Sequence, residues 1–219
     1  MAHEHHPPAI FLAGAVGLDF LNSVATPAAD LRMDWLADGD GLLAWLKQAH
    51  LVPAATLDAL RSQAMPGEMD RVAAQARSLR EWFRSFVQAR KGRPLSTQDL
   101  RELEPLNNLL QRDEEFSQIA ARDQDGPRDG SRDGTGALAL QVTRRWRAPD
   151  SLLLPIGQAM ARFVCDEDFA DVKACEGPNC TLMFVDHTRG RKRRWCSMAI
   201  CGNRTKAAAH RKRLKDDKS

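Results

Sequence analysis

The stretch Lys173–Arg204, KACEGPNCTLMFVDHTRGRKRRWCSMAICGNR, decides how the C-terminal part of this chain folds, because it holds four of the five cysteines. They form two Cys-x4-Cys pairs, Cys175 with Cys180 and Cys196 with Cys201, and 15 residues separate the pairs. Two pairs of thiolates supply the four soft ligands that a structural zinc ion takes in a tetrahedron. Such a closed site leaves no position for water, so we expect one structural Zn²⁺ and no catalysis by it.

The residues around these cysteines have the order of a small zinc module. Turn-forming residues occupy Glu176–Asn179, a short β-type run follows at Thr181–Val185, and His187–Gly190 supplies a second turn. The chain then returns through Arg193–Trp195 to the second pair, and from Asn203 onward it has high helix propensity. This order is typical of a treble-clef zinc module. About 45 residues cannot bury a sufficient core alone, and zinc would contribute on the order of 10 kcal/mol to their folding.

Other uses of the cysteines stay open at this stage. Four thiolates also hold iron–sulfur clusters, and two dithiols could serve redox chemistry, although Cys-x2-Cys is the more usual redox spacing. Structural disulfides are not expected, because we find no secretion signal. His187 could replace one sulfur ligand, but a turn residue is its more frequent role. The fifth cysteine, Cys165, lies in an apolar helical pattern and is expected to be a small buried side chain.

Positive charge is concentrated at the C-terminal end. Twelve Lys or Arg residues and two Asp lie in 189–219, which leaves 20 basic and 27 acidic side chains in the rest of the chain. A basic end on an acidic body suggests an anionic partner, although a merely solvated tail has the same composition. Lys and Arg bind phosphates, and a helix fits the DNA major groove. The side chains expected to contact nucleic acid are Arg191, Arg193, Arg194, Arg204, Lys206, His210, Arg211 and Arg213.

DNA is the expected partner, and RNA is not excluded by these residues. A zinc-dependent protein-interaction module is a further alternative. Trp195 could stack on a base, but packing over the zinc module is the more frequent role for an aromatic residue beside a metal ligand.

Residues 1–170 have the pattern of a mostly helical domain with a small strand component, and the zinc module follows at 171–219. Apolar side chains recur at steps of three and four residues and predict helices over 42–49, 54–64, 68–90, 100–109 and 151–167. Segments 115–121 and 137–147 alternate like strands and predict a β-hairpin, with a Gly- and Asp-rich tip between them. Ile10–Leu12 resembles a short strand. The fold class is therefore mainly α with a small β component (α+β).

Several side chains predict where these helices begin and break. Asp40 is a plausible N-cap for the helix over 42–49. Ser96 with Asp99 resembles a capping box for the helix that carries Leu100 to Leu109, and Pro105 should kink or split that helix. Pro155 fits only in the first turn of the last helix.

Two polar residues lie in the apolar segment GLDFLNSV (Gly17–Val24), namely Asp19 and Asn22. Buried polar groups need hydrogen-bond partners. They could line a ligand pocket or cap the backbone of a turn, and the residues alone favour capping.

No catalytic motif is found: the sequence has no GxSxG, no HExxH and no phosphate-binding glycine loop. Asp19, Asn22 and His50 are the only candidates for an enzyme, so we expect none. No apolar run reaches the roughly 18 residues of a membrane span. We expect a cytoplasmic protein that does not enter a membrane.

The segment WCSMAICGNR (Trp195–Arg204) resembles the CGNR zinc-finger family, which is named after its tetrapeptide, and GLDFLNSV resembles the opening of the ABATE domain that accompanies this finger. Members are described as stress-related transcriptional regulators whose finger is thought to bind DNA and whose ABATE domain is thought to sense an unidentified small molecule. The resemblance implies that the four paired cysteines are metal ligands and that the chain is a ligand-responsive regulator.

The resemblance leaves other questions open. With the resemblance taken into account, a ligand-binding role and a capping role for Asp19 and Asn22 have equal weight. The resemblance does not settle whether Arg204 contacts phosphate or a partner within the module, and it assigns no role to Asn203. A homodimer is a further partner that the sequence leaves open.

Overall fold

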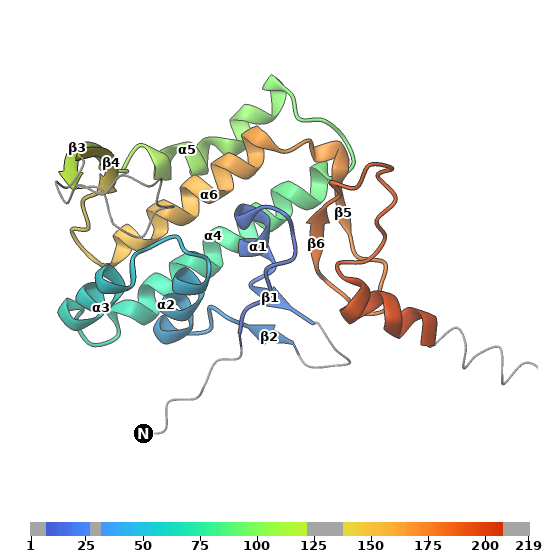
Figure 1. The fold of residues 1–219 in the computed structure, drawn as a ribbon, viewed down its shortest axis with the longest axis horizontal. Helices are drawn as coiled ribbons and strands as arrows, with labels where there is room; N and C mark the ends of the chain where they lie inside the picture. Colours follow the sequence, from blue (N-terminus) through green and yellow to red (C-terminus); the bar gives the residue numbers. More distant parts are fainter. Residues whose placement is uncertain (1–7, 27–31, 122–137, 208–219) are drawn as a thin grey trace, which may run out of the picture.

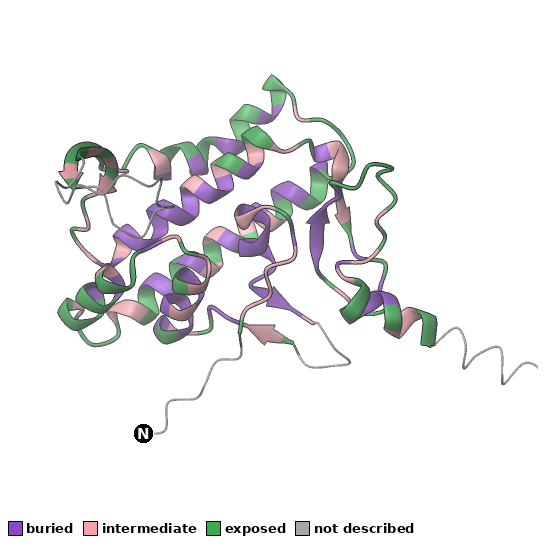
Figure 2. Ribbon diagram, viewed as in Figure 1, coloured by how far each residue is buried: buried purple, intermediate pink, exposed green. Residues whose placement is uncertain are grey.

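The computed structural model describes residues 8–26, 32–121 and 138–207. Most of this part of the chain is helical, and short antiparallel strand pairs complete it, so the fold is α+β. The helices α4 (Glu68–Arg90) and α6 (Leu153–Asp166) run across the molecule, and α1 (Val16–Leu21) packs against both (Figure 1). Their inward faces are buried (Figure 2). Within the described segments, no helix has the length and apolar character needed to cross a membrane.

The contact between α1 and α6 depends on a glycine. A Cβ at Gly17 would lie 2.4 Å from the carbonyl oxygen of Ala159, so no larger residue fits there without moving the helices apart. Farther along α6, the Phe163 ring lies 6.0 Å from Phe83 of α4 and 5.0 Å from Phe169. These aromatic contacts hold the second half of α6 to α4.

The remaining helices surround this core. Helix α2 (Gly39–Gln48) packs against α4, α3 (Ala54–Gln63) against α2, and α5 (Glu104–Leu110) against α6. The helices expected over 54–64 and 68–90 are confirmed.

The expected cap of α2 is wrong. Asp38, not Asp40, accepts a hydrogen bond from the Gly41 amide at 2.8 Å, and the helix begins at Gly39. Asp40 instead forms an exposed ion pair with Arg61 at 2.8 Å. Asp38 can cap because its own backbone is extended, as an N-cap requires.

The capping box and the break at Pro105 are confirmed. Ser96 and Asp99 cap a 3₁₀ segment, η1 (Thr97–Leu103), and α5 follows with Pro105 in its first turn. The last expected helix likewise starts as a 3₁₀ turn, η2 (Pro149–Leu152), before α6. Pro155 lies in the first turn of α6, where its missing N–H costs no helical hydrogen bond.

Two other expectations are wrong. Cys165 is exposed, because it follows the inward-facing Phe163 on the outer side of the last turn of α6. The second is Ile10–Leu12, which forms no strand. The next residue, Ala13, makes a single strand-like contact, in which its carbonyl accepts a hydrogen bond from the Val185 amide at 2.7 Å. A strand pair that the sequence did not indicate joins β1 (Val24–Ala25) to β2 (Met33–Asp34).

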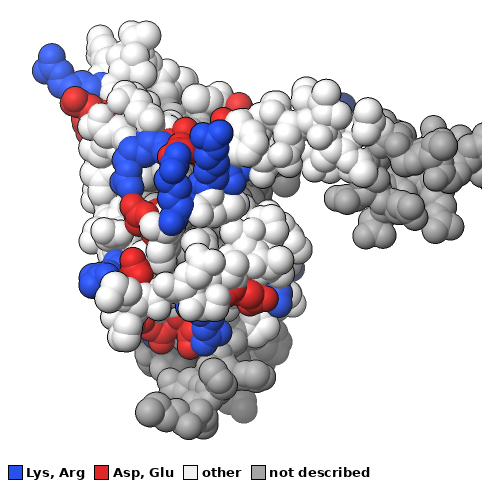
Figure 3. Space-filling model, turned by 90° about the vertical axis from the view of Figure 1, so that its left-hand side faces the viewer, with Lys and Arg blue, Asp and Glu red and all other residues white. Residues whose placement is uncertain are grey.

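The expected hairpin is present as β3 (Glu115–Ala121) and β4 (Leu138–Arg144), paired in register from Glu115 with Arg144 to Ala121 with Leu138. Its expected tip, 122–136, lies outside the described residues. Figure 3 shows the hairpin projecting as a largely uncharged arm from a face where basic and acidic side chains are mixed. Large apolar side chains are exposed on the arm: Phe116, Ile119, Leu138, Leu140 and Val142.

Candidate metal centre

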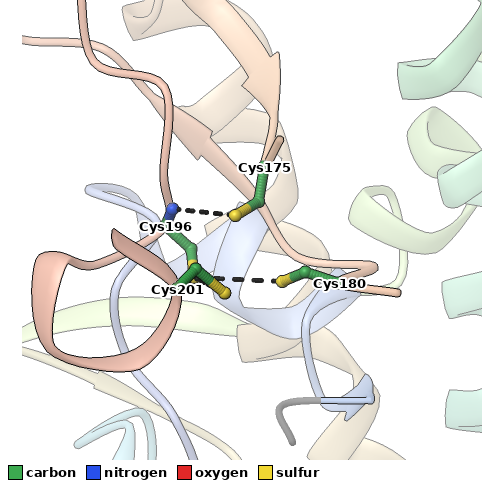
Figure 4. A group of neighbouring side chains, drawn as sticks. All are labelled: Cys175, Cys180, Cys196 and Cys201. Atoms are coloured by element: carbon green, nitrogen blue, oxygen red, sulfur yellow. Dashed lines mark hydrogen bonds between the residues drawn. The ribbon is translucent and has the colours of Figure 1, made fainter. Parts of the chain in front are cut away.

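The four paired cysteines converge on one point (Figure 4). Their sulfur atoms all lie within 4.8 Å of one another, with 3.6 Å between Cys196 and Cys201 and 3.9 Å between Cys180 and Cys196. A zinc ion holds each sulfur at about 2.3 Å, which places the corners of a tetrahedron roughly 3.8 Å apart. These separations therefore fit a four-thiolate zinc site.

The first cysteine pair is shaped by a strand and a tight turn. Cys175 follows β5 (Val172–Ala174), and its amide donates to the Leu182 carbonyl at 2.9 Å. The Cys180 amide then donates to the Gly177 carbonyl at 3.1 Å, which closes the turn. A Cβ at Gly177 would lie 2.8 Å from the Cys201 sulfur, so only glycine lets the two pairs approach this closely.

The second pair lies at the start of a helix, as expected. Cys196 precedes a π-helical turn, Met198–Gly202, which carries Cys201 and leads directly into helical residues 203–207. The Ser197 side chain accepts a bond from the Ile200 amide at 3.2 Å and so caps this turn.

The run at 181–185 was expected to form a hairpin with the returning segment 193–195, but it pairs with the segment before the first cysteine. β6 (Met183–Val185) pairs with β5, from Val172 with Val185 to Ala174 with Met183, whereas 193–195 form no strand. The reason lies at Asp186, which accepts a bond from the Arg193 amide at 2.9 Å and turns that segment away from strand pairing.

Hydrogen-bond donors surround the sulfur atoms. The Cys196 amide lies 3.2 Å and the Gly177 amide 3.4 Å from the Cys175 sulfur. The Arg204 guanidinium donates to the Cys201 sulfur at 3.2 Å. Four thiolates around a divalent cation keep a net negative charge, and these donors offset it. Two roles were open for Arg204, a phosphate contact and a contact within the module, and the structure shows the contact within the module.

The sulfur cluster also changes the acidity of its thiols. A hydrogen bond from Cys196 lowers the pKa of Cys180 to about 5. The same hydrogen bond, together with burial, raises the pKa of Cys196, and burial raises that of Cys201. One thiolate is therefore available at neutral pH, and a metal ion would displace protons from its neighbours.

Asp186 organises the loop between the pairs and was missed in the sequence. It is fully buried and accepts bonds from Lys173 at 2.7 Å and from the Thr188 hydroxyl at 2.6 Å and amide at 3.0 Å. Burial alone would raise the pKa of Asp186, but hydrogen bonds from Lys173, Thr188 and Arg193 outweigh it and hold the pKa well below its usual range. An Asp two residues before a Thr, just after a short strand, is a turn signature that could have indicated this role.

Arg193 is a structural residue of the module. Its guanidinium donates to the carbonyls of Leu12 at 3.0 Å, of Trp195 at 3.1 Å and of Cys196, and it lies 4.1 Å from the centre of the Phe184 ring. These contacts occupy most of the guanidinium N–H donors that a phosphate would need. The structure therefore gives no support to the expected nucleic-acid contact at Arg193.

Two further residues that were expected to contact nucleic acid form ion pairs within the protein. Arg191 pairs with Asp171 at 3.0 Å, and Arg194 pairs with Glu176 at 2.6 Å and lies over the Trp195 ring. Both are exposed, and Trp195 is partly buried against the core of the module.

Other cations of the module face solvent. Among the described residues, Arg189, Lys192 and Lys206 are exposed and form no ion pair. The expected contacts His210, Arg211 and Arg213 lie outside the described residues.

Asp19 and Asn22 bind the backbone. Asp19 is buried and accepts bonds from the amides of Leu12 and Ala13, each at 2.9 Å, and burial raises its pKa to about 6. The Asn22 amide donates to the Met183 carbonyl at 2.8 Å and accepts from the Met183 amide at 3.0 Å. The structure has a cavity between α6 and the β3–β4 hairpin and another between α4 and residues 180–183, and neither Asp19 nor Asn22 lines either of them. The geometry thus matches the capping alternative and gives the ligand-binding alternative no support.

Comparisons with known proteins place these observations in a family. Residues 172–214 match the model of the CGNR zinc finger, and residues 14–167 match that of ABATE, described as "Putative stress-induced transcription regulator". Both matches confirm the resemblance and its order along the chain. No curated protein matches the sequence.

Proposed function

Because this chain belongs to the ABATE family and ends in a CGNR zinc finger, we propose that it is a cytoplasmic, ligand-responsive transcriptional regulator that binds DNA through that finger. One zinc ion, held by all four cysteines, has a structural role. The protein has no catalytic role.

The observation that carries this proposal is the convergence of the four sulfurs at the start of a helix. Cys201 lies in the turn that leads into helical residues 203–207. A metal bound to Cys201 and to the first pair fixes the direction in which this helix leaves the module. A basic helix held in this way presents its side chains to a polyanion without first being ordered, which reduces the entropic cost of binding.

The exposed cations of the module support a nucleic-acid partner. Arg189, Lys192 and Lys206 are free of ion pairs within the described part of the chain, and the sequence continues with Arg211, Lys212, Arg213 and Lys215. Side chains of this kind bind phosphates and give affinity that depends on salt.

The contacts between the finger and the helices support a response to a ligand. Asn22 binds Met183, and Glu167 at the end of α6 lies 2.7 Å from the ring nitrogen of His187 in the finger. A ligand that changes the helical part has these direct contacts through which to affect the finger, which is what coupling between two sites requires.

Salt dependence of DNA binding tests this proposal. Fluorescence anisotropy of the full, zinc-loaded chain on duplex DNA should show affinity falling as salt rises from 50 to 200 mM. Three phosphate contacts alone predict a roughly fortyfold loss, since each contributes about −0.9 to the slope of log K against log salt. A flat profile would contradict DNA binding, and preferential competition by single- or double-stranded RNA would favour the RNA alternative.

A further inference from the structure

A cavity of about 450 Å³ lies beside α6, away from the sulfur cluster. It is bounded by α6, the segment 14–16, the loop at His50–Pro53 and the base of the β3–β4 hairpin. Its size falls within the range of small-molecule pockets. Apolar side chains form much of its wall: Val16, Val142, Trp146, Ala159 and Phe163.

The charges around this cavity are unbalanced. Five charged side chains line it: Glu115, Asp166, Glu167, Arg144 and Arg162. Arg144 donates two hydrogen bonds of 2.5 and 2.7 Å to Asp113, outside the lining, and also lies 3.7 Å from the Glu115 carboxylate. With Asp113 included, four carboxylates therefore stand against the two guanidinium groups of Arg144 and Arg162, and the electrostatic potential of the cavity favours a cation.

The end of α6 adds to this negative potential. Asp166 is the last residue of the helix and Glu167 is its C-cap, where unpaired carbonyls carry partial negative charge. Acidic side chains are unfavourable at that end of a helix, and cations are favourable. Asp166 is exposed, and its carboxylate forms no hydrogen bond or ion pair with any residue in the described segments. A cation in the cavity would relieve the repulsion between this carboxylate and the helix end.

We propose that this cavity is the ligand site of the protein and that it takes an organic cation with an apolar body. The apolar wall receives the body, and Asp166 with the C-terminal end of α6 receives the positive charge. This inference rests on the proposed ligand-responsive function and moves the site away from Asp19 and Asn22.

The cavity is also connected to the zinc finger. Glu167, which lines it, binds His187 of the finger at 2.7 Å. Gly14, also in the lining, packs on the same ring: a Cβ there would lie 3.2 Å from a ring carbon of His187. A bound cation competes with His187 for the Glu167 carboxylate. Occupancy of the cavity thereby loosens the loop that follows Asp186.

Two ions of equal size and opposite charge test the site. Tetraphenylphosphonium and tetraphenylborate are titrated into the full, zinc-loaded protein by calorimetry, without DNA. The phosphonium should bind and the borate should bind at least about tenfold more weakly, since attraction and repulsion by the same carboxylates oppose each other. Equal affinity for both ions would overturn the assignment of charge.

The variant Asp166→Asn identifies the residue responsible. Asp166 has no described partner, so the fold should persist, and phosphonium affinity should fall roughly three- to tenfold, the range expected for one partly exposed charge pair. Glu104→Gln, at an exposed position in the first turn of α5, removes the same charge outside the lining and should leave affinity unchanged. Unchanged affinity in Asp166→Asn, or an equal loss in Glu104→Gln, would overturn the site.

Hydrogen exchange tests the connection to the finger. Phosphonium should speed amide exchange over residues 186–194 in the wild type but not in Glu167→Gln, and no change in the wild type would contradict the coupling. Because these measurements use no DNA, they separate two failures. Cation binding without DNA affinity would reject the proposed regulator and keep the cavity site. DNA affinity without cation binding would reject the cavity site and keep the DNA-binding function.

Discussion

The side-chain amide of Asn22 pairs with the backbone of Met183 much as a neighbouring strand would, donating to its carbonyl at 2.8 Å and accepting from its amide at 3.0 Å. The two residues are 161 positions apart, at the end of α1 and in β6 of the zinc finger. The finger is therefore docked on the helices by buried hydrogen bonds.

Replacing Asn22 with Ala should destabilise the protein by about 2–3 kcal/mol, because it leaves the buried amide and carbonyl of Met183 without partners. Urea denaturation of the zinc-loaded protein measures the free energy of unfolding. Asn108→Ala is the matched control, since Asn108 is exposed on α5. Equal stabilities of the two variants would mean that the docking contact contributes nothing.

Gly177→Ala should weaken zinc binding by about tenfold or more. The new Cβ would lie 2.8 Å from the Cys201 sulfur, so this ligand must move off its position, and displaced ligand geometry costs metal affinity. Competition with a chromophoric chelator gives the affinity. At Gly190 a Cβ would meet only the Lys192 side chain at 3.8 Å, so Gly190→Ala should bind zinc like the wild type.

Asp19 should make the protein less stable as pH rises from 4 to 7. Burial raises its pKa in the folded state to about 6 from the ordinary 3.8. The folded state therefore holds the proton more tightly than the unfolded state, and the resulting stabilisation is complete below pH 3.8 and lost as pH rises through 6.

Comparison with Asp19→Asn isolates this effect, because zinc binding and the other carboxylates change with pH alike in both proteins. The free energy of unfolding of the wild type should fall relative to the variant by roughly 2–3 kcal/mol between pH 4 and 7. A constant difference between them across this range would show that Asp19 titrates normally.

Variants of the neighbouring residues Arg193 and Lys192 should differ in effect. The Arg193 variant should lose stability, whereas the Lys192 variant should lose a phosphate contact. Arg193→Gln removes the charge and cannot reproduce the guanidinium contacts with Leu12, Trp195 and Cys196. It should cost about 1–3 kcal/mol of stability and leave the salt slope of DNA binding unchanged. Lys192→Gln should leave stability unchanged and reduce the slope by about 1 if this exposed side chain binds phosphate. The opposite assignment of effects would contradict the structural role of Arg193.

The sequence predicted the cluster of four cysteines and the long helix because both depend on spacing. The cysteine pairs follow from composition and turn residues, and α4 follows from the recurrence of Val72, Ala76, Phe83 and Val87, all of which are buried. Such periodic signals report which face is covered, whatever covers it.

The sequence could not predict which polar groups bind which backbone atoms across long separations. Arg193 looks like any other basic residue in the run of four at 191–194, yet it binds the carbonyl of Leu12, 181 positions away. Asp38 and Asp40 are equally good caps by type, and the backbone conformation of Asp38 decides between them. These contacts depend on tertiary packing, which a local pattern does not contain.

Zinc content and DNA affinity in Cys180→Ser, compared with Cys165→Ser, decide whether a metal ion orders the finger for DNA binding. Cys180 belongs to the sulfur cluster, whereas Cys165 is exposed on α6 and lies outside it. We predict one zinc per chain and full DNA affinity for Cys165→Ser, and loss of both for Cys180→Ser. Cys180→Ser that keeps its zinc, or that binds DNA like the wild type without zinc, would contradict a metal-ordered DNA-binding finger.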